Sequence, residues 1–431
     1  MTSSSTASFT AGLASGDCAP KGVNGSSPSR VPRRLCSLSQ PPSLSAFKTL
    51  CSQSTSRETY PHGSAIVSNI PIYDLPTDAA AADPGFIDEL QDEWHHILLS
   101  GPGVVVLRNF TPDTALLEQV NTVFSDIIAA EESAAAAEGP HNKGDHFAAS
   151  GTNARIWNSF QKHAERDPSS FVRYYSNPYL AAVCAAWLGA AYQITAQVNL
   201  VRPGGKPQVS HRDYHLGFQT AESCALYPRA TQVATQFLTL QGAVAHSDMP
   251  LASGPTRFLP FSQQFEQGFM AYRLREFQAF FDENWVSCEL KMGDAVFFNP
   301  ALFHAAGENR TTHVQRSANL LQISSAFGKT MESIDTLAII SKCWAEVTKM
   351  YDTADTDDAG TQLGTRKRVQ AILSAMGNGY PFPTNLDRRP PAPGGMAPES
   401  EIDILQKGLM GGWDVAEVVA AITAIRTDSM P

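Results

Sequence analysis

The stretch His211-Arg212-Asp213 decides which fold and which chemistry this chain predicts. Alternate side chains on a β-strand share a face, so His211 and Asp213 can point at one ion while Arg212 points away. A second histidine, His304, follows 91 residues after Asp213, and Arg316 follows 12 residues after His304. Two imidazoles and one carboxylate hold ferrous iron on one triangular face and leave three positions open. The spacing therefore predicts a non-haem iron oxygenase.

A run with a period of two precedes this stretch. Gln193, Thr195, Gln197 and Asn199 alternate with apolar residues, which is typical of a half-buried strand. In an ordinary sandwich the polar face would lie outside, whereas in a sheet that closes around an active site it lines the pocket. We expect the pocket, with Gln197 and Asn199 as candidate binding residues because they lie nearest His211 in sequence.

Further short motifs follow the H-x-D triplet in order. Gly254-Pro255-Thr256 forms a turn, and Gly293-Asp294 leads into the apolar run Ala295–Asn299 just before His304. At these residues the chain resembles the phytanoyl-CoA dioxygenase family of Fe(II)/2-oxoglutarate oxygenases. The resemblance covers roughly residues 64 to 328 and includes the opening Gly103–Phe110.

The resemblance implies a mainly β fold. Its core is a double-stranded β-helix, a jelly roll of the cupin-like kind, with helices flanking one face. Between the motifs we expect short strands at 104–107, 230–240, 286–290, 295–299 and 318–324. The expected helices lie at 88–99, 111–128, 178–188, 331–351, 366–376 and 413–425.

The resemblance also implies the cofactors and the reaction. Fe(2+) would be bound by His211, Asp213 and His304, with 2-oxoglutarate and O2 as co-substrates. Arg316 would pair with the far carboxylate of 2-oxoglutarate, because its guanidinium is a planar fork, and Arg310 is the substitute. Gln197 and Asn199, taken from the strand pattern, are further candidates for binding the co-substrate. Thr256 is most simply structural, since Gly254 and Pro255 fix the backbone of the turn, and its hydroxyl is the other candidate.

We expect hydroxylation of a C–H bond of a small organic substrate, with release of succinate and CO2. Desaturation or rearrangement stays open. Halogenating relatives replace the carboxylate ligand with a small residue, so Asp213 disfavours halogenation. The substrate cannot be read from the sequence, since acyl-CoA thioesters, amino-acid-like solutes and secondary metabolites all occur in the family.

Several other histidines need a separate interpretation. His246-Ser247-Asp248 is a second H-x-D, but it directly precedes the Gly-Pro-Thr turn, where the family has a polar loop rather than its metal pair. We expect His215, on the strand face of His211, to contact the ligands or the substrate. His313, in the turn before Arg316, is expected to be solvated.

Two other classes of protein share such residues. A non-catalytic jelly-roll protein would bind a metal or a partner without turnover. A zinc hydrolase with the same three ligands would need a general base and no 2-oxoglutarate. Turnover of 2-oxoglutarate separates the oxygenase from both alternatives.

The organisation of the chain is uneven. Residues 1–57 hold six basic residues against one acid, a formal charge of +5 that leaves −15 for the remainder. This Ser/Pro/Gly-rich stretch predicts a disordered or targeting segment over 1–60, before a dioxygenase domain at 64–328. A helical extension at 329–431 contains a Pro/Gly-rich linker at 380–398, and we expect it to pack on the barrel, with a lid or a homodimer contact as alternatives.

Composition restricts the partners and the compartment. The net charge of −10 argues against nucleic acid, and no apolar run approaches the roughly 20 residues that a membrane-spanning helix needs. Seven scattered cysteines without a C-x-x-C pair predict reduced thiols. We expect a cytoplasmic protein, with a mitochondrial location through the N-terminal segment as the alternative.

Overall fold

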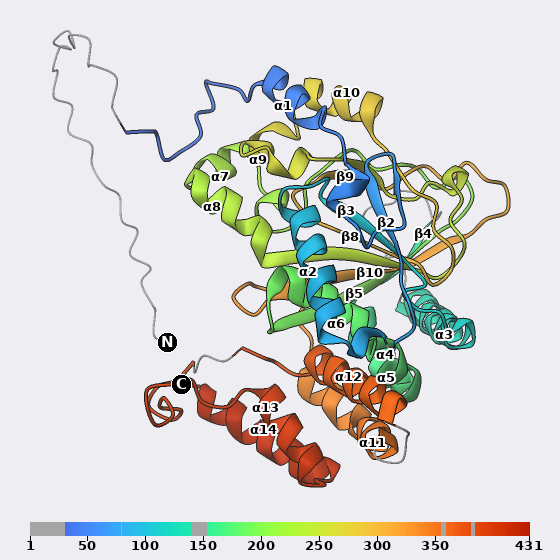
Figure 1. The fold of residues 1–431 in the computed structure, drawn as a ribbon, viewed down its shortest axis with the longest axis vertical. Helices are drawn as coiled ribbons and strands as arrows, with labels where there is room; N and C mark the ends of the chain where they lie inside the picture. The colour runs from blue at the N-terminus through green and yellow to red at the C-terminus, as the bar shows by residue number, and fades with distance from the viewer. Residues whose placement is uncertain (1–30, 79, 139–152, 355–358, 381–383) are drawn as a thin grey trace, which may run out of the picture. The chain divides into compact units, whose positions relative to one another are not determined.

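The centre of the fold is a large sheet whose neighbouring strands come from distant parts of the sequence (Figure 1). The computed structural model describes residues 31–78, 80–138, 153–354, 359–380 and 384–431, and eight strands of this part join the sheet. Neighbours are antiparallel except β2 and β3, which are parallel. In order across the sheet they are β1 (Ala65–Val67), β2 (Ile70–Asp74), β3 (Val104–Arg108), β8 (Ala295–Phe298), β6 (Thr239–Ala245), β10 (Arg316–Ser325), β5 (Tyr192–Val201) and β4 (Asn153–Ile156).

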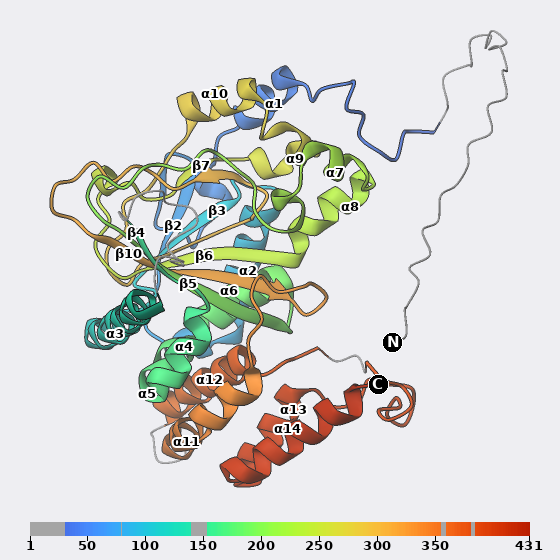
Figure 2. The same cartoon turned by 180° about the vertical axis from the view of Figure 1, so that it is seen from behind.

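A small second sheet faces the large one across a cavity. It pairs β7 (Arg257–Leu259) with β9 (Phe303–Ala305), and single bridges extend it to His211 and Val286. Figure 2 shows the molecule from behind, with β7 above β2 and β3 in the view. The two-sheet, mainly β core with flanking helices is the predicted fold class, which is confirmed.

The outer face of the large sheet is apolar and packs under helices. Ile194 and Ala196 of β5 share one core with Trp94 of α2 (Pro84–Leu99) and Val183 of α6 (Pro178–Leu188). Each large apolar side chain buried in this way contributes about 1.5–3 kcal/mol. Because side chains alternate on a strand, the opposite residues of the same strands line the cavity.

Helix α6 begins and ends where the sequence predicts. The Asn177 side chain accepts hydrogen bonds from the backbone N–H groups of Tyr179 and Leu180, and Pro178 occupies the first helical turn. Gly189 ends the helix with φ 84°, a conformation that favours glycine. The sequence signals at both ends therefore fix the position of α6 on the sheet.

The C-terminal part is helical and packs against other helices of the core. Trp344 is buried there, and its Nε1 donates to the carbonyl oxygen of Trp413 at 2.9 Å. The helices are α11 (Thr336–Ala354), α12 (Ala359–Met376), α13 (Glu401–Met410) and α14 (Val415–Ser429), and α11 and α12 contact α4 (Ser159–Arg166), α5 (Pro168–Tyr175) and α6. These contacts agree with the packing interpretation, and a lid or homodimer role stays a prediction.

The predicted N-terminal boundary needs a correction. Residues 1–30 lie outside the described residues, but Leu44–Cys51 forms helix α1, which begins after a Ser43 cap. Phe47 is 0% exposed and packs against Phe265, Phe277 and Phe303. The expectation that residues 1–60 lie outside the fold is therefore wrong for this helix, whose apolar residues are spaced to share one face.

Two predicted strands are also wrong. Residues 229–234 form α8 (Arg229–Ala234) and 235–238 a 3-10 turn, because Val233 and Phe237 have helical spacing. The Phe237 ring lies tilted by 45° against that of Trp187. Residues 286–290 make only single bridges. The other described helices are α3 (Thr114–Glu138), α7 (Ala221–Ala225), α9 (Gly268–Ala271) and α10 (Arg275–Asn284). The remaining 3-10 turns are at Arg57–Thr59, Ala80–Ala82, His215–Phe218, Leu251–Ser253 and Ser262–Gln264.

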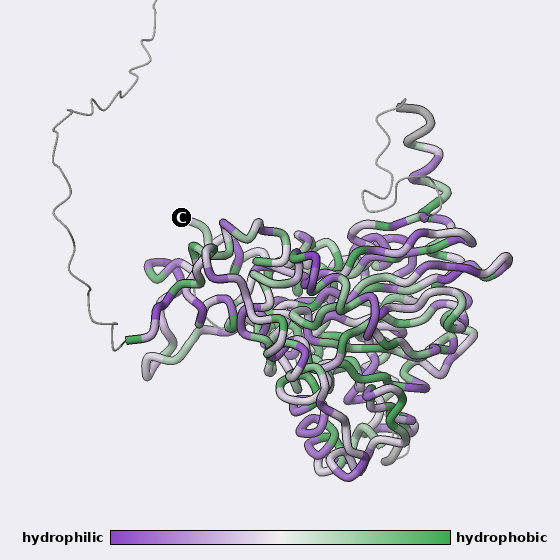
Figure 3. The backbone as a smooth tube through the Cα atoms, turned by 90° about the horizontal axis from the view of Figure 1, so that it is seen from above, coloured by the Kyte–Doolittle hydropathy of each residue, from purple (hydrophilic) through white to green (hydrophobic). Residues whose placement is uncertain are grey.

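Hydrophobic residues are dispersed along the chain. Figure 3 shows hydrophobic and hydrophilic residues following each other closely through the strands and helices. Among the described residues, no helix combines the length and the apolar character needed to cross a membrane.

Phe47→Ala tests whether α1 belongs to the folded core. Removing a phenylalanine from a cluster of aromatic rings leaves a cavity, and we expect the free energy of unfolding to fall by about 3–5 kcal/mol. Denaturant unfolding measures the change, and Phe327→Ala, at a side chain 77% exposed, is the control. A loss in Phe47→Ala no larger than in the control would show that α1 is dispensable.

Candidate metal centre

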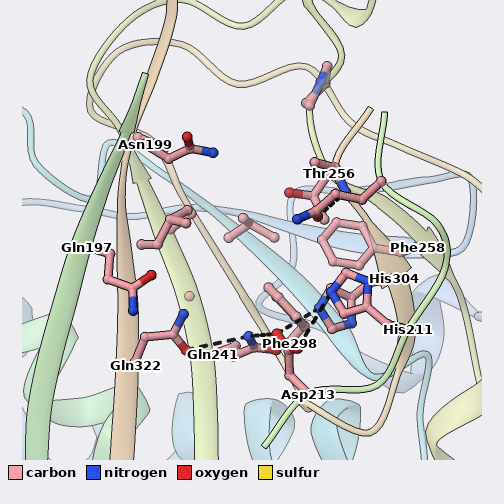
Figure 4. A pocket seen from close by; sticks show the side chains of 18 of the residues that line it. Gln197, Asn199, His211, Asp213, Gln241, Thr256, Phe258, Phe298, His304 and Gln322 are labelled. Carbon is pink, nitrogen blue, oxygen red and sulfur yellow. Dashed lines mark hydrogen bonds and ion pairs between the residues drawn. The ribbon is translucent and has the colours of Figure 1, made fainter. Parts of the chain in front are cut away.

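Backbone pairing in the small sheet brings the two predicted histidines together. His211 N–H donates to the His304 carbonyl at 2.9 Å, and His304 N–H donates to the His211 carbonyl at 3.1 Å. Asp213 completes the group, with its Oδ1 at 3.6 Å from Nε2 of His211 and its Oδ2 at 3.3 Å from Nε2 of His304. One ligand atom from each residue lies within 4.8 Å of the others, as Figure 4 shows from inside the pocket.

The orientation of both imidazole rings suits a metal. Nδ1 of His211 is 2.9 Å from the Val209 carbonyl, and Nδ1 of His304 is 2.8 Å from the Leu302 carbonyl. A carbonyl oxygen only accepts, so Nδ1 carries the proton in both rings and Nε2 presents a lone pair toward Asp213. Backbone partners of this kind hold the ring and the tautomer of a metal-ligating histidine.

The charge state of the group also suits a metal. Burial alone would raise the pKa of Asp213, but the neighbouring His211 and His304 and the amide of Gln241 hold it well below its ordinary value. Burial lowers the pKa of His211. An ionised carboxylate and a neutral imidazole are the forms that bind a divalent cation, so the donor set fits ferrous iron.

Gln241 of β6 is a further part of the centre that the sequence did not indicate. Its side chain is 4% exposed, and Nε2 donates to Oδ2 of Asp213 at 2.5 Å. The only signal in the sequence is one glutamine at an inward position of an otherwise apolar strand. The contact fixes one carboxylate oxygen of Asp213 and thereby orients the other.

Arg212 points away from the centre, as predicted for the middle residue of the triplet. Its guanidinium is buried over the rings of Phe269 and Phe303 and donates to the Ser262 carbonyl at 2.7 Å. Burial lowers the pKa of Arg212 to about 9, so it stays charged at neutral pH. Arg212 therefore holds the segment His211–Asp213 in place from the side that faces away from the metal centre.

The triad opens into a cavity of about 780 Å³ between the two sheets. Gln197, Asn199, Thr256 and Arg316 all line this cavity, as expected from the sequence. Figure 4 places Gln197 and Asn199 on the wall across from Thr256 and the histidines. The polar face of β5 thus faces inward.

Arg316 is 7% exposed, and its guanidinium donates to the Gly254 carbonyl in the Gly-Pro-Thr turn. Burial lowers the pKa of Arg316 to about 10, which still leaves it protonated at neutral pH. Arg310, the alternative, is exposed and is absent from the described cavity lining. Arg316 is therefore the cavity arginine of the two.

The second H-x-D lies elsewhere. His246 is buried among helices, with Nε2 at 2.9 Å from the Tyr174 hydroxyl and Nδ1 at 2.7 Å from Oδ1 of Asn121. Burial lowers its pKa to about 3. Asp248 instead accepts from the Met292 N–H, so the two residues form no described metal group.

His215 and His313 both lie away from the described lining of the cavity. The chain leaves the extended conformation directly after Asp213, with φ 62° at Tyr214 and φ 41° at His215. His215 therefore does not share the strand face of His211, and the described cavity lining does not include it. The expectation that His215 lies on the strand face of His211 and contacts the metal ligands or the substrate is therefore wrong. His313 is exposed, as predicted.

Comparison with known proteins decides the family. The model of the family described as phytanoyl-CoA dioxygenase (PhyH) matches residues 99–318, just over half of the chain. The chain belongs to the phytanoyl-CoA dioxygenase family. It is an iron(II)- and 2-oxoglutarate-dependent dioxygenase, as the resemblance implied, which decides against the zinc hydrolase and the non-catalytic protein.

Solved structures similar to this dioxygenase share little sequence with it. SnoN, a non-heme alpha ketoglutarate dependent epimerase from nogalamycin biosynthesis, is 17% identical over 57% of this chain and 84% of that chain, with a TM-score of 0.38. SnoK, a carbocyclase from the same biosynthesis, is 17% identical over 56% and 86%, with a TM-score of 0.39. EvdMO1 is 16% identical over 55% and 50%, with a TM-score of 0.38. No curated protein matches the chain.

Gln241→Leu tests the contact behind Asp213. Without the amide, the carboxylate loses a hydrogen bond that orients it, and we expect the affinity for Co(II), a spectroscopic stand-in for iron, to fall 10–100-fold. Absorbance titration of the metal-free protein measures this. Gln322→Leu is the control, since Gln322 lies beside Gln241 but has no described bond to Asp213. Equal losses in both variants would contradict the proposed role.

Proposed function

We propose that this dioxygenase hydroxylates a C–H bond of a small organic substrate, with His211, Asp213 and His304 holding the iron. The observation that carries the proposal is the convergence of these three ligand atoms within 4.8 Å on the wall of a cavity that also contains Arg316. When bound, iron, 2-oxoglutarate and O2 together supply the oxidising chemistry and yield succinate and CO2. The protein supplies ligands, charge and orientation.

Arg316 and Thr256 are the proposed binding residues for the far carboxylate of 2-oxoglutarate. The guanidinium already donates to the Gly254 carbonyl, two residues before Thr256, so the turn that carries Thr256 also holds the arginine. A buried guanidinium attracts a carboxylate strongly because little water screens the pair. We assign Gln197 and Asn199 to the same pocket, on the wall that faces the substrate.

The walls of the cavity restrict the outcome of the reaction. Phe258 and Phe298 lie beside His304, with the Phe298 ring centroid 4.8 Å from that of His304, and exclude water from one side of the centre. In the proposed site the Asp213 carboxylate is the third protein ligand of the iron, so a halide cannot take that ligand position. Hydroxylation is the proposed outcome, and desaturation or rearrangement would appear as a different product in the same assay.

His304→Ala tests the ligand set. We expect the variant to lose at least tenfold in Fe(II) affinity and to lose 2-oxoglutarate turnover, because two remaining ligands hold iron weakly. Metal analysis after gel filtration and succinate release measure both effects. His313→Ala, at an exposed histidine, is the control and should keep wild-type values. Unchanged iron content in His304→Ala would refute the assignment.

Arg316→Ala tests the co-substrate site. We expect the apparent KM for 2-oxoglutarate to rise at least 30-fold while Fe(II) affinity stays within about twofold, because a truncated partner of a buried charge pair typically costs about 2–5 kcal/mol. Steady-state succinate release and a metal titration separate the two effects. Arg310→Ala is the matched control, and the same rise in that variant instead would move the site to Arg310.

A further inference from the structure

The cavity has one wall of carboxamides. Gln322 of β10 pairs directly with Gln241 of β6, and Gln197 of β5 pairs with Leu320, two residues before Gln322. The three side chains come from neighbouring strands and all line the cavity (Figure 4). We call Gln197, Gln241 and Gln322 the amide wall. Apolar side chains at these three inward positions would stabilise the fold more than amides do. The three amides therefore indicate that the cavity binds a polar ligand.

The part of the cavity beside the amide wall is apolar. Val106, Val296 and Phe298 come from β3 and β8 of the same large sheet, where Phe298 pairs directly with Gln241, and Phe258 comes from the small sheet. The cavity therefore offers hydrogen bonds next to a flat apolar surface. A ring that carries polar groups along one edge matches this division, whereas an unsubstituted alkyl chain matches only half of it.

Two oppositely charged side chains, Arg155 and Glu332, line the cavity near the amide wall. Nη1 of Arg155 donates to Oε1 of Gln197 at 2.8 Å, and Oε1 of Glu332 accepts from the backbone N–H of Asn158 at 2.8 Å. Burial raises the pKa of Glu332, and the bonds from Asn158 and Gln197 and the charges of Lys162 and Arg155 oppose that rise. The Glu332 carboxylate thus lies beside both Gln197 and Arg155.

Three acceptor atoms of lining residues have no hydrogen-bond partner among the described residues: Oδ1 of Asn199, Oε1 of Gln241 and Oε2 of Glu332. The orientation of Gln241 is fixed because Asp213 can only accept from its Nε2. These atoms are buried, so bulk solvent does not satisfy them. A ligand that donates a hydrogen bond to them is favoured over one that cannot, because a buried acceptor without a donor is costly.

Charge favours a neutral ligand. The charged groups of the lining outside the histidines are Arg155, Arg212, Asp213, Arg316 and Glu332, three cations and two anions. The Arg212 guanidinium is engaged behind the triplet, where it donates to the Ser262 carbonyl and lies over the Phe269 ring. Asp213 and Arg316 serve the iron and 2-oxoglutarate in the proposed function, and Arg155 offsets Glu332. No cavity cation is left to balance an anionic substrate.

We propose that the primary substrate is a neutral, hydroxyl-rich molecule whose hydroxyl groups donate to Gln241 and Glu332 while its apolar face lies against Phe258 and Phe298. The proposal rests on the proposed oxygenase function and assigns the substrate class of the same site. Glu332 lies beyond residues 99–318, which match the family, so this recognition comes from the chain's own C-terminal part.

The experiment uses the full chain and a panel of cyclic polyols and methyl glycosides, each paired with its deoxygenated analogue, together with acyl-CoA thioesters. Saturation-transfer NMR on the metal-free protein reports binding, and succinate release above the substrate-free rate reports turnover. We expect hydroxylated members to bind and to stimulate succinate release at least tenfold better than their deoxygenated partners.

Variants locate the contact. Glu332→Leu should weaken the best hydroxylated ligand at least tenfold, whereas Glu332→Gln, which keeps an acceptor, should weaken it less than threefold. Glu283→Leu, at an exposed glutamate of α10, is the matched control. If Glu332→Leu does not fold, Gln322→Leu should weaken the same ligand, since it removes one amide of the wall.

Several outcomes would overturn the inference. Deoxygenated analogues or acyl-CoA thioesters that bind as well as the hydroxylated members would do so, as would a hydroxylated ligand insensitive to both Glu332→Leu and Gln322→Leu. An equal loss in Glu332→Gln and Glu332→Leu would indicate a cationic substrate instead. Absence of any iron-dependent 2-oxoglutarate turnover would count against the proposed function, while binding to the metal-free protein would still test the substrate class.

Discussion

The site depends on one backbone interaction, the pairing of His211 with His304. The two hydrogen bonds of this bridge join segments 93 residues apart and place the imidazole centroids 4.5 Å from each other. Directly opposed residues of antiparallel strands share a face, so both histidines point into the cavity together. Asp213 follows on the same segment, and the metal group is therefore a direct consequence of how the small sheet is paired.

The Gly254-Pro255-Thr256 turn secures this arrangement from the other side. Gly254 has φ 74°, and a Cβ atom built there would lie 2.4 Å from the Glu308 carbonyl oxygen, so only glycine fits against the chain that follows His304. Its own carbonyl accepts from Arg316. One glycine thus couples the strand of the distal histidine to the arginine, which explains why a turn motif with no reactive group accompanies the iron ligands.

Sequence reasoning reached the residues whose spacing and alternation are local or belong to a motif. The triplet His211–Asp213, the distal His304 and the inward face of Gln197 and Asn199 follow from such patterns. Gln241 carries only a weak local signal and Glu332 none, because their positions near Asp213 and Gln197 arise from strand pairing and from the path of the chain after β10. The prediction for residues 1–60 is wrong at α1 because the tertiary packing of Phe47 decides that helix. The prediction for residues 230–238 is wrong because the helical spacing of Val233 and Phe237 competes with their β-propensity.

The C-terminal helices determine part of the pocket even though they contribute no described metal ligand. Glu332 lies four residues before Thr336, where α11 begins, and Thr336 donates to Oε2 of Glu401 at 3.0 Å. Arg426 of α14 donates to the other oxygen of this buried carboxylate at 2.8 Å. A buried carboxylate that lost its partner would be strongly destabilising, so this network holds the start of α11 in place. Helices remote from the iron ligands thereby position Glu332, and changes in them would alter how the pocket binds its substrate before they altered the metal centre.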